Sequence, residues 1–284
     1  MMKVSNNTYL RCCALLLGIF CLSGSAAFAQ EKNDRSSKKR DFCSYNNYSH
    51  NGKVSYKETR EVTVNAGNLL TVDGKRNGGI EVRAENRPDV LVRACIQTVG
   101  VTEEEARNFA RNIRIETSPN VRAENIADES NWGVSYEILV PRSTNLKLST
   151  HNGGIALFSV EGTIEFDAHN GGIFLSEVAG DVKGKTRNGG LHVKLAGNSW
   201  KGDGLDVQTT NGGVHLEISE NYAANIQTGT VNGGFNSEIS QLSIERKDRS
   251  FGGKINTNLN GGGAPVRVIT TNGGVKITSS AKNL

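Results

Sequence analysis

The chain has 284 residues, of which 33 are Gly and 4 are Pro, and its formal net charge is +4. Gly is enriched without recurring at every third position, and the hydrophobic share of 36% is ordinary once Gly is added. These values exclude a collagen, a disordered chain and a polytopic membrane protein, and they fit one or two globular domains.

Residues 1–29 are predicted to form a signal peptide. Lys3 and Arg11 give a positive start, residues 14–22 are an apolar run too short to span a bilayer, and residues 27–29 are an Ala-Phe-Ala cleavage sequence. We expect cleavage after Ala29 and export to the periplasm, the outer surface or the medium. A membrane anchor is the alternative for this segment. No later segment is apolar for long enough to span a membrane as a helix.

The segment after the signal peptide, residues 30–55, is predicted to be a polar linker. Subtracting Lys3 and Arg11 from 33 basic residues leaves 31 against 29 acidic residues, so no nucleic-acid partner is indicated. Cys43 and Cys95 are the two cysteines beyond the signal peptide, and an exported protein would join them as a disulfide. The alternative is one buried thiol and one cysteine in a flexible arm.

Residues 56–144 are predicted to form a β-rich N-terminal part with one short helix at residues 102–113. Thr102 and Glu105 have the spacing of a capping box, and Ala106 and Ala110 lie on one apolar face with two further residues, Phe109 and Ile113. We expect this part to begin the structure of the following repeats and to cover their open end.

An internal repeat dominates residues 145–280. From Asn152 the triplet Asn-Gly-Gly returns at intervals of 18, 18, 23 and 21 residues, Phe251-Gly252-Gly253 takes the next place, and Asn272 follows. Apolar residues alternate before and after each triplet, the period of a strand, and the triplet at Asn260 is expected to be a turn. The triplets begin at Asn77, Asn152, Asn170, Asn188, Asn211, Asn232, Asn260 and Asn272.

Two arrangements of these strands compete. Asn-Gly alone is typical of a hairpin turn, which would pair the strands on either side of it. The outward residues Lys147, Glu165, Lys183 and Asp206 alternate in charge, which favours parallel pairing of equivalent strands in successive repeats. We therefore predict an all-β, right-handed parallel β-helix with coils of 18–23 residues and one short N-terminal capping helix.

The repeated Asn is assigned a structural role in this prediction. Its side-chain amide would bond to the equivalent Asn of the next coil, while the two Gly residues permit the sharp corner. The corner residues are Asn77, Asn152, Asn170, Asn188, Asn211, Asn232 and Asn272.

One surface cluster is the candidate binding site: His151, Asp167, His169, Lys185 and Arg187. In a parallel stack the two His rings would be neighbours, with Asp167 on the same face. A metal site and the active site of a carbohydrate-active β-solenoid enzyme are alternatives, and so is a solvated polar surface. Because no third ligand and no catalytic motif is evident, we predict no metal, no cofactor and no catalytic residue.

Two other pairs of residues have alternative explanations. His192 and His215 form a second equivalent pair, with the same alternatives of a metal site and a solvated surface. Trp132 and Trp200 lie near Gly residues, where each is either a platform for a sugar or an anchor for its loop.

Several of these segments resemble a bacterial putative-adhesin family of unknown function that is related to GIN-like head domains. The matching segments are 67–82, the helix 103–113, 136–141, 145–150 and the repeated Asn-Gly-Gly-Ile, so the resemblance covers about residues 56–280. It implies a non-enzymatic exported scaffold that binds a surface glycan or an envelope protein. Many members have Asn-Gly-Asp at the corner, and its absence here weakens metal binding there. A carbohydrate-active enzyme and an envelope-stress accessory domain remain alternatives, and the oligomeric state is not predicted.

Overall fold

The computed structural model describes residues 42–43, 52–127, 131–244 and 252–280, all within the compact unit Asp41–Leu284. The predicted signal peptide and nearly all of the linker lie outside the described residues. Within the described ranges, no helix is both long and apolar enough to cross a membrane.

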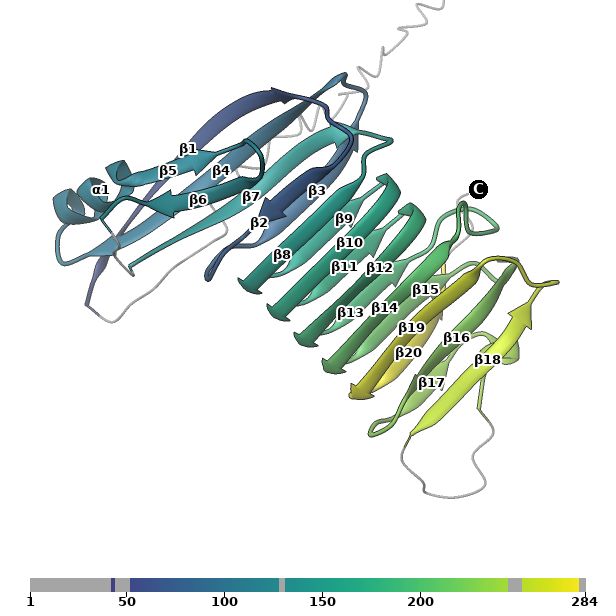
Figure 1. Ribbon diagram of the computed structural model, residues 1–284. Coiled ribbons are helices and arrows are strands. Elements are labelled where there is room, and N and C mark those ends of the chain that lie inside the picture. The colour runs from purple at the N-terminus through teal and green to yellow at the C-terminus, as the bar shows by residue number, and fades with distance from the viewer. Residues whose placement is uncertain (1–41, 44–51, 128–130, 245–251, 281–284) are drawn as a thin grey trace, which may run out of the picture. The chain divides into compact units, whose positions relative to one another are not determined.

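The described residues form two ten-stranded sheets, called sheet A and sheet B (Figure 1). In spatial order, sheet A contains β1 (Val54–Asn65), β4 (Asp89–Gly100), β7 (Trp132–Pro141), β3 (Ile80–Glu85), β9 (Ile155–Phe158), β11 (Ile173–Ser176), β13 (Leu191–Lys194), β15 (Val214–Ile218), β20 (Val275–Ser279) and β17 (Phe235–Ser237). Sheet B contains β18 (Gly253–Leu259), β16 (Ala224–Thr230), β19 (Pro265–Asn272), β14 (Gly204–Asn211), β12 (Ala179–Asn188), β10 (Glu161–Asn170), β8 (Leu146–Asn152), β2 (Leu70–Asp73), β6 (Val121–Asn125) and β5 (Ile113–Glu116).

From β8 to β15 the chain alternates between the two sheets. β10 pairs in parallel with β8 and β12, and β11 pairs in parallel with β9 and β13. The strands on either side of Asn170 therefore lie in different sheets and do not pair with each other. Parallel pairing of equivalent strands is confirmed, and the hairpin alternative is wrong for these repeats.

The core lies between the sheets and is built from the alternate, inward-facing residues of each strand. Leu148, Phe166, Gly184 and Val207 share one register row across β8, β10, β12 and β14. A Cβ atom added at Gly184 would lie 2.1 Å from the ring of Phe166. The Phe166 ring thus fills the space of two rows, and Gly184 leaves room for it.

A row of buried threonines ties successive corners together inside the core. Thr186, Thr209 and Thr270 each donate a hydrogen bond of 2.7 Å to the carbonyl of the first Gly of a neighbouring triplet. Thr150 donates in the same way to Gly78, at 2.6 Å. A buried hydroxyl needs such a partner, so these bonds satisfy both groups within the core.

The N-terminal part extends sheet A with antiparallel strands and carries the helix. β4 pairs antiparallel with β1 and β7, and α1 (Glu103–Arg111) packs against β1, β4 and β5 (Figure 1). Thr102 caps α1 by accepting a hydrogen bond from the Glu105 amide at 3.2 Å. The helix buries Ala106 and Ala110 completely.

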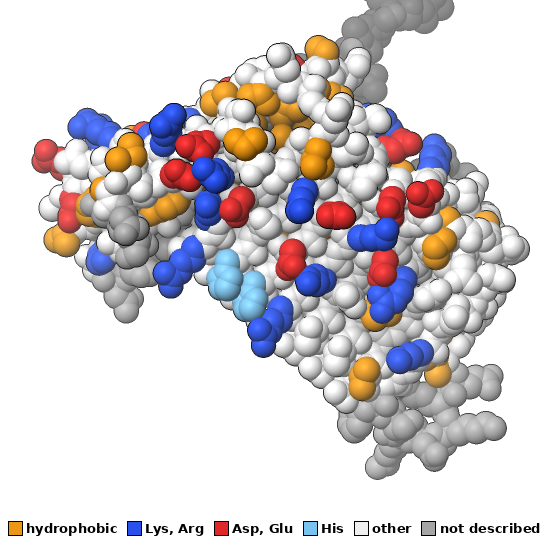
Figure 2. Space-filling model, viewed as in Figure 1, with side chains coloured by type: hydrophobic (Ala, Val, Ile, Leu, Met, Phe, Trp, Pro, Cys, Tyr) orange, Lys and Arg blue, Asp and Glu red, His pale blue; other side chains and the backbone are white. Residues whose placement is uncertain are grey.

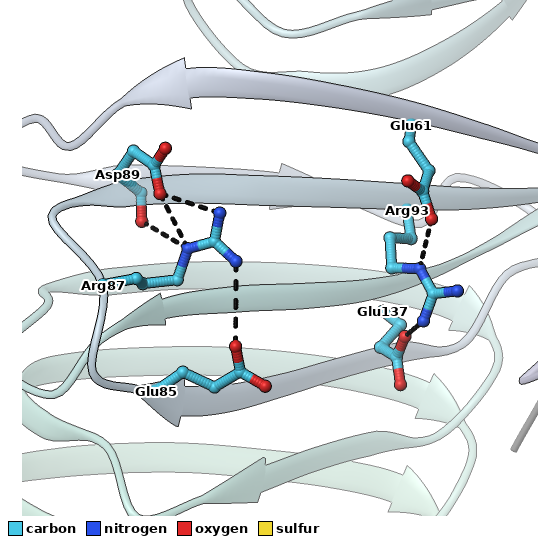
Figure 3. A network of polar contacts seen from close by, with 6 residues as sticks. All are labelled: Glu61, Glu85, Arg87, Asp89, Arg93 and Glu137. Atoms are coloured by element: carbon cyan, nitrogen blue, oxygen red, sulfur yellow. Dashed lines mark hydrogen bonds and ion pairs between the residues drawn. The ribbon is translucent and has the colours of Figure 1, made fainter. Parts of the chain in front are cut away.

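Ion pairs cross the outer face of these antiparallel strands (Figure 3). Arg93 of β4 donates from Nε to Glu61 Oε1 of β1 at 2.7 Å and bonds to Glu137 of β7 on its other side. Nearby, Arg87 pairs with Asp89 at 2.7 Å and with Glu85 at 3.8 Å. Arg93 is only 12% exposed, so its two carboxylate partners offset the cost of removing the charge from water.

A disulfide between Cys43 and Cys95 joins the start of the described chain to the middle of β4. Both cysteines are buried, with exposed fractions of 4% and 0%.

The order of the last repeats differs from the order in the sequence. The spacing predicts that Asn232, and then the Phe251 triplet, follow Asn211 in the stack. This is wrong: Asn272 lies beside Asn211, and Asn232 lies beyond Asn272. Phe251 itself lies outside the described residues.

Long-range contacts explain why β19 is inserted between β14 and β16. Arg267 of β19 pairs with Asp206 of β14, and Thr270 continues the row of buried threonines. β16 has Gln227 where β19 has Arg267, so it offers no charge to Asp206. β16 instead pairs antiparallel with β18 on its far side, and Asn260 lies in the turn after β18.

Candidate functional site

The corner asparagines form one continuous chain of side-chain hydrogen bonds. Asn170 Nδ2 donates to Asn152 Oδ1 at 2.8 Å, and the same bond recurs from Asn77 to Asn232 at 2.8–3.0 Å. Each amide donates to one neighbour and accepts from the other, so both groups are satisfied although the side chains are exposed. The ladder follows the spatial order of the strands, with Asn272 between Asn211 and Asn232.

The two glycines of each triplet meet different surroundings. A Cβ atom on the first glycine, as at Gly171, would lie 2.0 Å from the carbonyl oxygen of Gly153. A Cβ atom on the second, as at Gly172, would have its nearest neighbour at 3.5 Å, the ordinary van der Waals distance. Only the first glycine is therefore required by the packing of the corners.

The predicted cluster of His151, Asp167, His169, Lys185 and Arg187 lies on the outer face of sheet B. The rings of His151 and His169 stack with centroids 4.5 Å apart and an interplanar angle of 8°. Lys185 Nζ lies 3.3 Å from Asp167 Oδ2, and Arg187 follows two residues later on the same strand. The structure therefore brings the five residues into two neighbouring register rows.

This face of sheet B has little free charge. Figure 2 shows Lys and Arg side chains intermingled with Asp and Glu over one face of the molecule. Asp206 pairs with Arg267, but Lys183 pairs at 3.0 Å with Asp181 of its own strand rather than across the stack. In the described part of the chain, no three His, Cys, Asp or Glu residues are grouped closely enough to hold a metal.

A groove runs across five strands of sheet A and has a volume of about 930 Å³. Its floor contains the second glycines, which are all exposed, and one wall carries the outward residues Phe174, His192, His215, Lys276 and Asn236. We call the five glycines the second-glycine row: Gly172, Gly190, Gly213, Gly274 and Gly234.

The wall of the groove is a stack of rings. The centroids of Phe174 and His192 are 4.8 Å apart, and those of His192 and His215 are 4.5 Å apart. The stack continues beyond the groove through Phe158, whose ring lies 5.3 Å from that of Phe174. His215 Nε2 also contacts Thr278 Oγ1 at 2.9 Å, which fixes the orientation of this ring.

Burial lowers the pKa of His192, and the neighbouring His215 and Lys194 lower it further, against the opposing effect of Glu217. At pH 7 the His192 side chain is therefore an uncharged ring. Glu217 pairs with Lys194 at 3.7 Å, whereas Lys276 has no ion-pair partner among the described residues. The charge at the end of the ring stack is thus positive.

Reasoning from the sequence found the His192–His215 pair but not the groove. The missing signal was Phe174, which stands in the equivalent position one repeat earlier and extends the pair into a stack. Trp200 is not a platform: it is 7% exposed and donates from Nε1 to the Gly180 carbonyl at 2.9 Å, so it anchors its loop. Trp132 is partly buried and packs against the core.

No family model and no curated protein matches the chain. Two solved structures are similar to it. One is a putative cell adhesion protein from Clostridium sporogenes, with 13% identity over 79% of this chain and 100% of that chain, and a TM-score of 0.45. The other is a putative adhesin from Bacteroides fragilis, with 7% identity over 78% of this chain and 97% of that chain, and a TM-score of 0.30.

Proposed function

We propose that the protein is a non-enzymatic, exported, adhesin-like binding module of the cell envelope, a member of the putative-adhesin family that its sequence resembles. Its two sheets would be the walls of a right-handed solenoid with coils of 18–23 residues, the hand that parallel crossovers favour. The Cys43–Cys95 disulfide supports export, because disulfides persist mainly in oxidising compartments. The ligand would be a surface glycan or an envelope protein, bound without a cofactor.

The observation that carries this proposal is the groove on sheet A. It is an open, largely apolar depression with a few polar groups along one side, which is typical of binding sites. A glycoside hydrolase uses a pair of carboxyl groups, one on each side of the scissile bond. No carboxylate lines this groove, and Asp167 on the other sheet is paired with Lys185.

Binding and turnover can be measured on the same purified protein. We expect it to co-sediment with isolated cell-envelope material and to release no new reducing ends or unsaturated products from polysaccharides. Asp167→Asn is the control variant, because it removes the carboxylate of the predicted cluster. Product release that this variant abolishes would establish an enzyme and overturn the proposal.

A further inference from the structure

We propose that the groove on sheet A binds a saccharide chain that carries carboxylates, with its sugar rings on the ring stack and its oxygens along the second-glycine row. This inference rests on the proposed function and names the chemical class of its ligand. It depends on four features of the groove: its glycine floor, its backbone amides, its ring wall and its charge.

The floor is free of side chains although packing does not demand it. A Cβ atom at Gly172 or Gly274 would have its nearest neighbour at 3.5 Å, and one at Gly234 would have none within 4 Å. None of these glycines has the positive φ that disfavours other residues. The chain itself contains the counterexample: Ser135 of β7 stands beside Gly79 in the equivalent position and carries a side chain there.

The backbone amides of the floor are available as donors. Ser135 Oγ accepts a hydrogen bond from the Gly79 amide at 3.3 Å. Within the ranges that the structure describes, the amides of the second-glycine row form no such bond. A hydroxyl group therefore already occupies this place at the start of the stack, and a ligand oxygen would take the equivalent place further along it.

The wall offers what the face of a sugar ring contacts. A pyranose has an apolar face of C–H groups and a rim of hydroxyls, so it stacks on flat rings while its rim makes hydrogen bonds. Phe174, His192 and His215 present such rings at successive strands, 4.8 and 4.5 Å apart. The lowered pKa of His192 keeps this ring uncharged at neutral pH.

The charge of the groove favours an acidic saccharide over a neutral one. Lys276 follows His215 in the register of sheet A and has no ion pair among the described residues. The nearby carboxylate of Glu217 is already paired with Lys194 at 3.7 Å. Lys276 and the exposed amides therefore present positive potential without a compensating negative group, which a carboxylate would complement.

Isothermal titration calorimetry with oligomers of polygalacturonate and with dextran tests the inference. We expect the protein to bind the acidic oligomer and dextran at least tenfold more weakly. Lys276→Gln should weaken polygalacturonate binding about tenfold. Gly172→Ser with Gly274→Ser should weaken it by at least as much, because the new side chains fill the floor. Lys185→Gln, on the opposite sheet, is the matched control and should bind as the unaltered protein does.

Each outcome decides a different point. Equal binding of dextran, or no effect of Lys276→Gln, overturns the acidic ligand. Polygalacturonate binding that survives all groove variants but is lost in Lys185→Gln overturns this site and leaves the proposed function standing. Binding of neither oligomer overturns the inference, while envelope co-sedimentation without turnover would still support the binding module. Should the glycine variants fail to fold, Phe174→Leu tests the wall alone, and unchanged binding there counts against the inference.

Discussion

Two adjacent glycines in one triplet have opposite requirements, and this can be measured by stability. Gly171→Ala would place a methyl group 2.0 Å from the Gly153 carbonyl oxygen, and the backbone would have to shift. We expect it to lower the free energy of unfolding by about 1–3 kcal/mol, the usual cost of overpacking.

Gly172→Ala is the matched control for that substitution. Its Cβ atom meets ordinary contacts, and Ala restricts the unfolded chain more than Gly does. We expect a change between about zero and a gain of 1 kcal/mol in urea unfolding. Equal losses in both variants would show that the second glycine is also a requirement of the fold, and would remove one support for the saccharide groove.

His192 makes stability depend on pH in a direction that follows from its surroundings. Burial, together with His215 and Lys194, lowers its pKa below the ordinary value of 6.5. The unfolded chain therefore binds a proton more readily than the folded chain does. This contribution to stability is complete above pH 6.5 and is lost as the pH falls through the lowered pKa.

Unfolding by urea at a series of pH values between about 5 and 7.5 measures this effect. The unaltered protein should lose stability toward the acid end, and His192→Asn should lose less over the same interval. A variant whose acid loss equals that of the unaltered protein would contradict the assignment to His192. An NMR titration of the ring gives the direction of the pKa shift independently.

The order of the strands at the C-terminal end is tested by engineered cysteine pairs. Asp206 of β14 and Arg267 of β19 are register partners, which places their Cα atoms about 5 Å apart. Asp206→Cys with Arg267→Cys should therefore form a disulfide, because this separation suits one. Asp206→Cys with Gln227→Cys is the matched pair. β19 separates β14 from β16, so these atoms lie about 10 Å apart and should remain unlinked. Linkage of the second pair alone, seen by peptide mass spectrometry, would restore the order of the sequence.

The elements that local sequence determines were predictable, and those that distant contacts determine were not. The capping box at Thr102 and Glu105 indicates where α1 begins, and the helix does begin there. Parallel pairing followed from the alternating charges at Lys147, Glu165 and Lys183. The triplets at Asn232 and Asn272 are locally identical, so only partners far along the chain, such as Asp206, select which of them lies next to Asn211.

The candidate site shows the same limit. The cluster on sheet B was predictable because its His residues stand at equivalent places in neighbouring repeats. The groove on sheet A needs two further facts that a sequence does not contain. One is that the second glycine is free of steric demand, and the other is that its amide lacks a partner among the described residues.

At the scale of the whole molecule, the two sheets use the same repeat for different surfaces. On sheet B the outward rows carry opposite charges that pair within or between strands, as Asp167 does with Lys185. On sheet A the rows beside the corners carry rings and bare backbone, ending at Lys276. A regular stack gives each row a straight line of identical spacing, which suits a linear ligand with a repeating unit.

The disulfide is the one covalent link in the described chain that joins segments distant in sequence, and its removal tests how far it stabilises the whole fold. It closes a loop with a sequence separation of 52 residues, and the loss of that constraint on the unfolded chain costs about 4 kcal/mol. We expect Cys43→Ser with Cys95→Ser to lower the free energy of unfolding by about 2–4 kcal/mol.

The unaltered protein unfolded in the presence of a reductant is the control for that variant, and it should match the variant. Because Cys95 is fully buried in β4, its replacement also removes packing that the reductant leaves intact. A loss in the variant that reduction does not reproduce would therefore assign the effect to the core of β4 rather than to the link. Unchanged stability under both conditions would show that the folded repeats, and not this link, hold the N-terminal part in place.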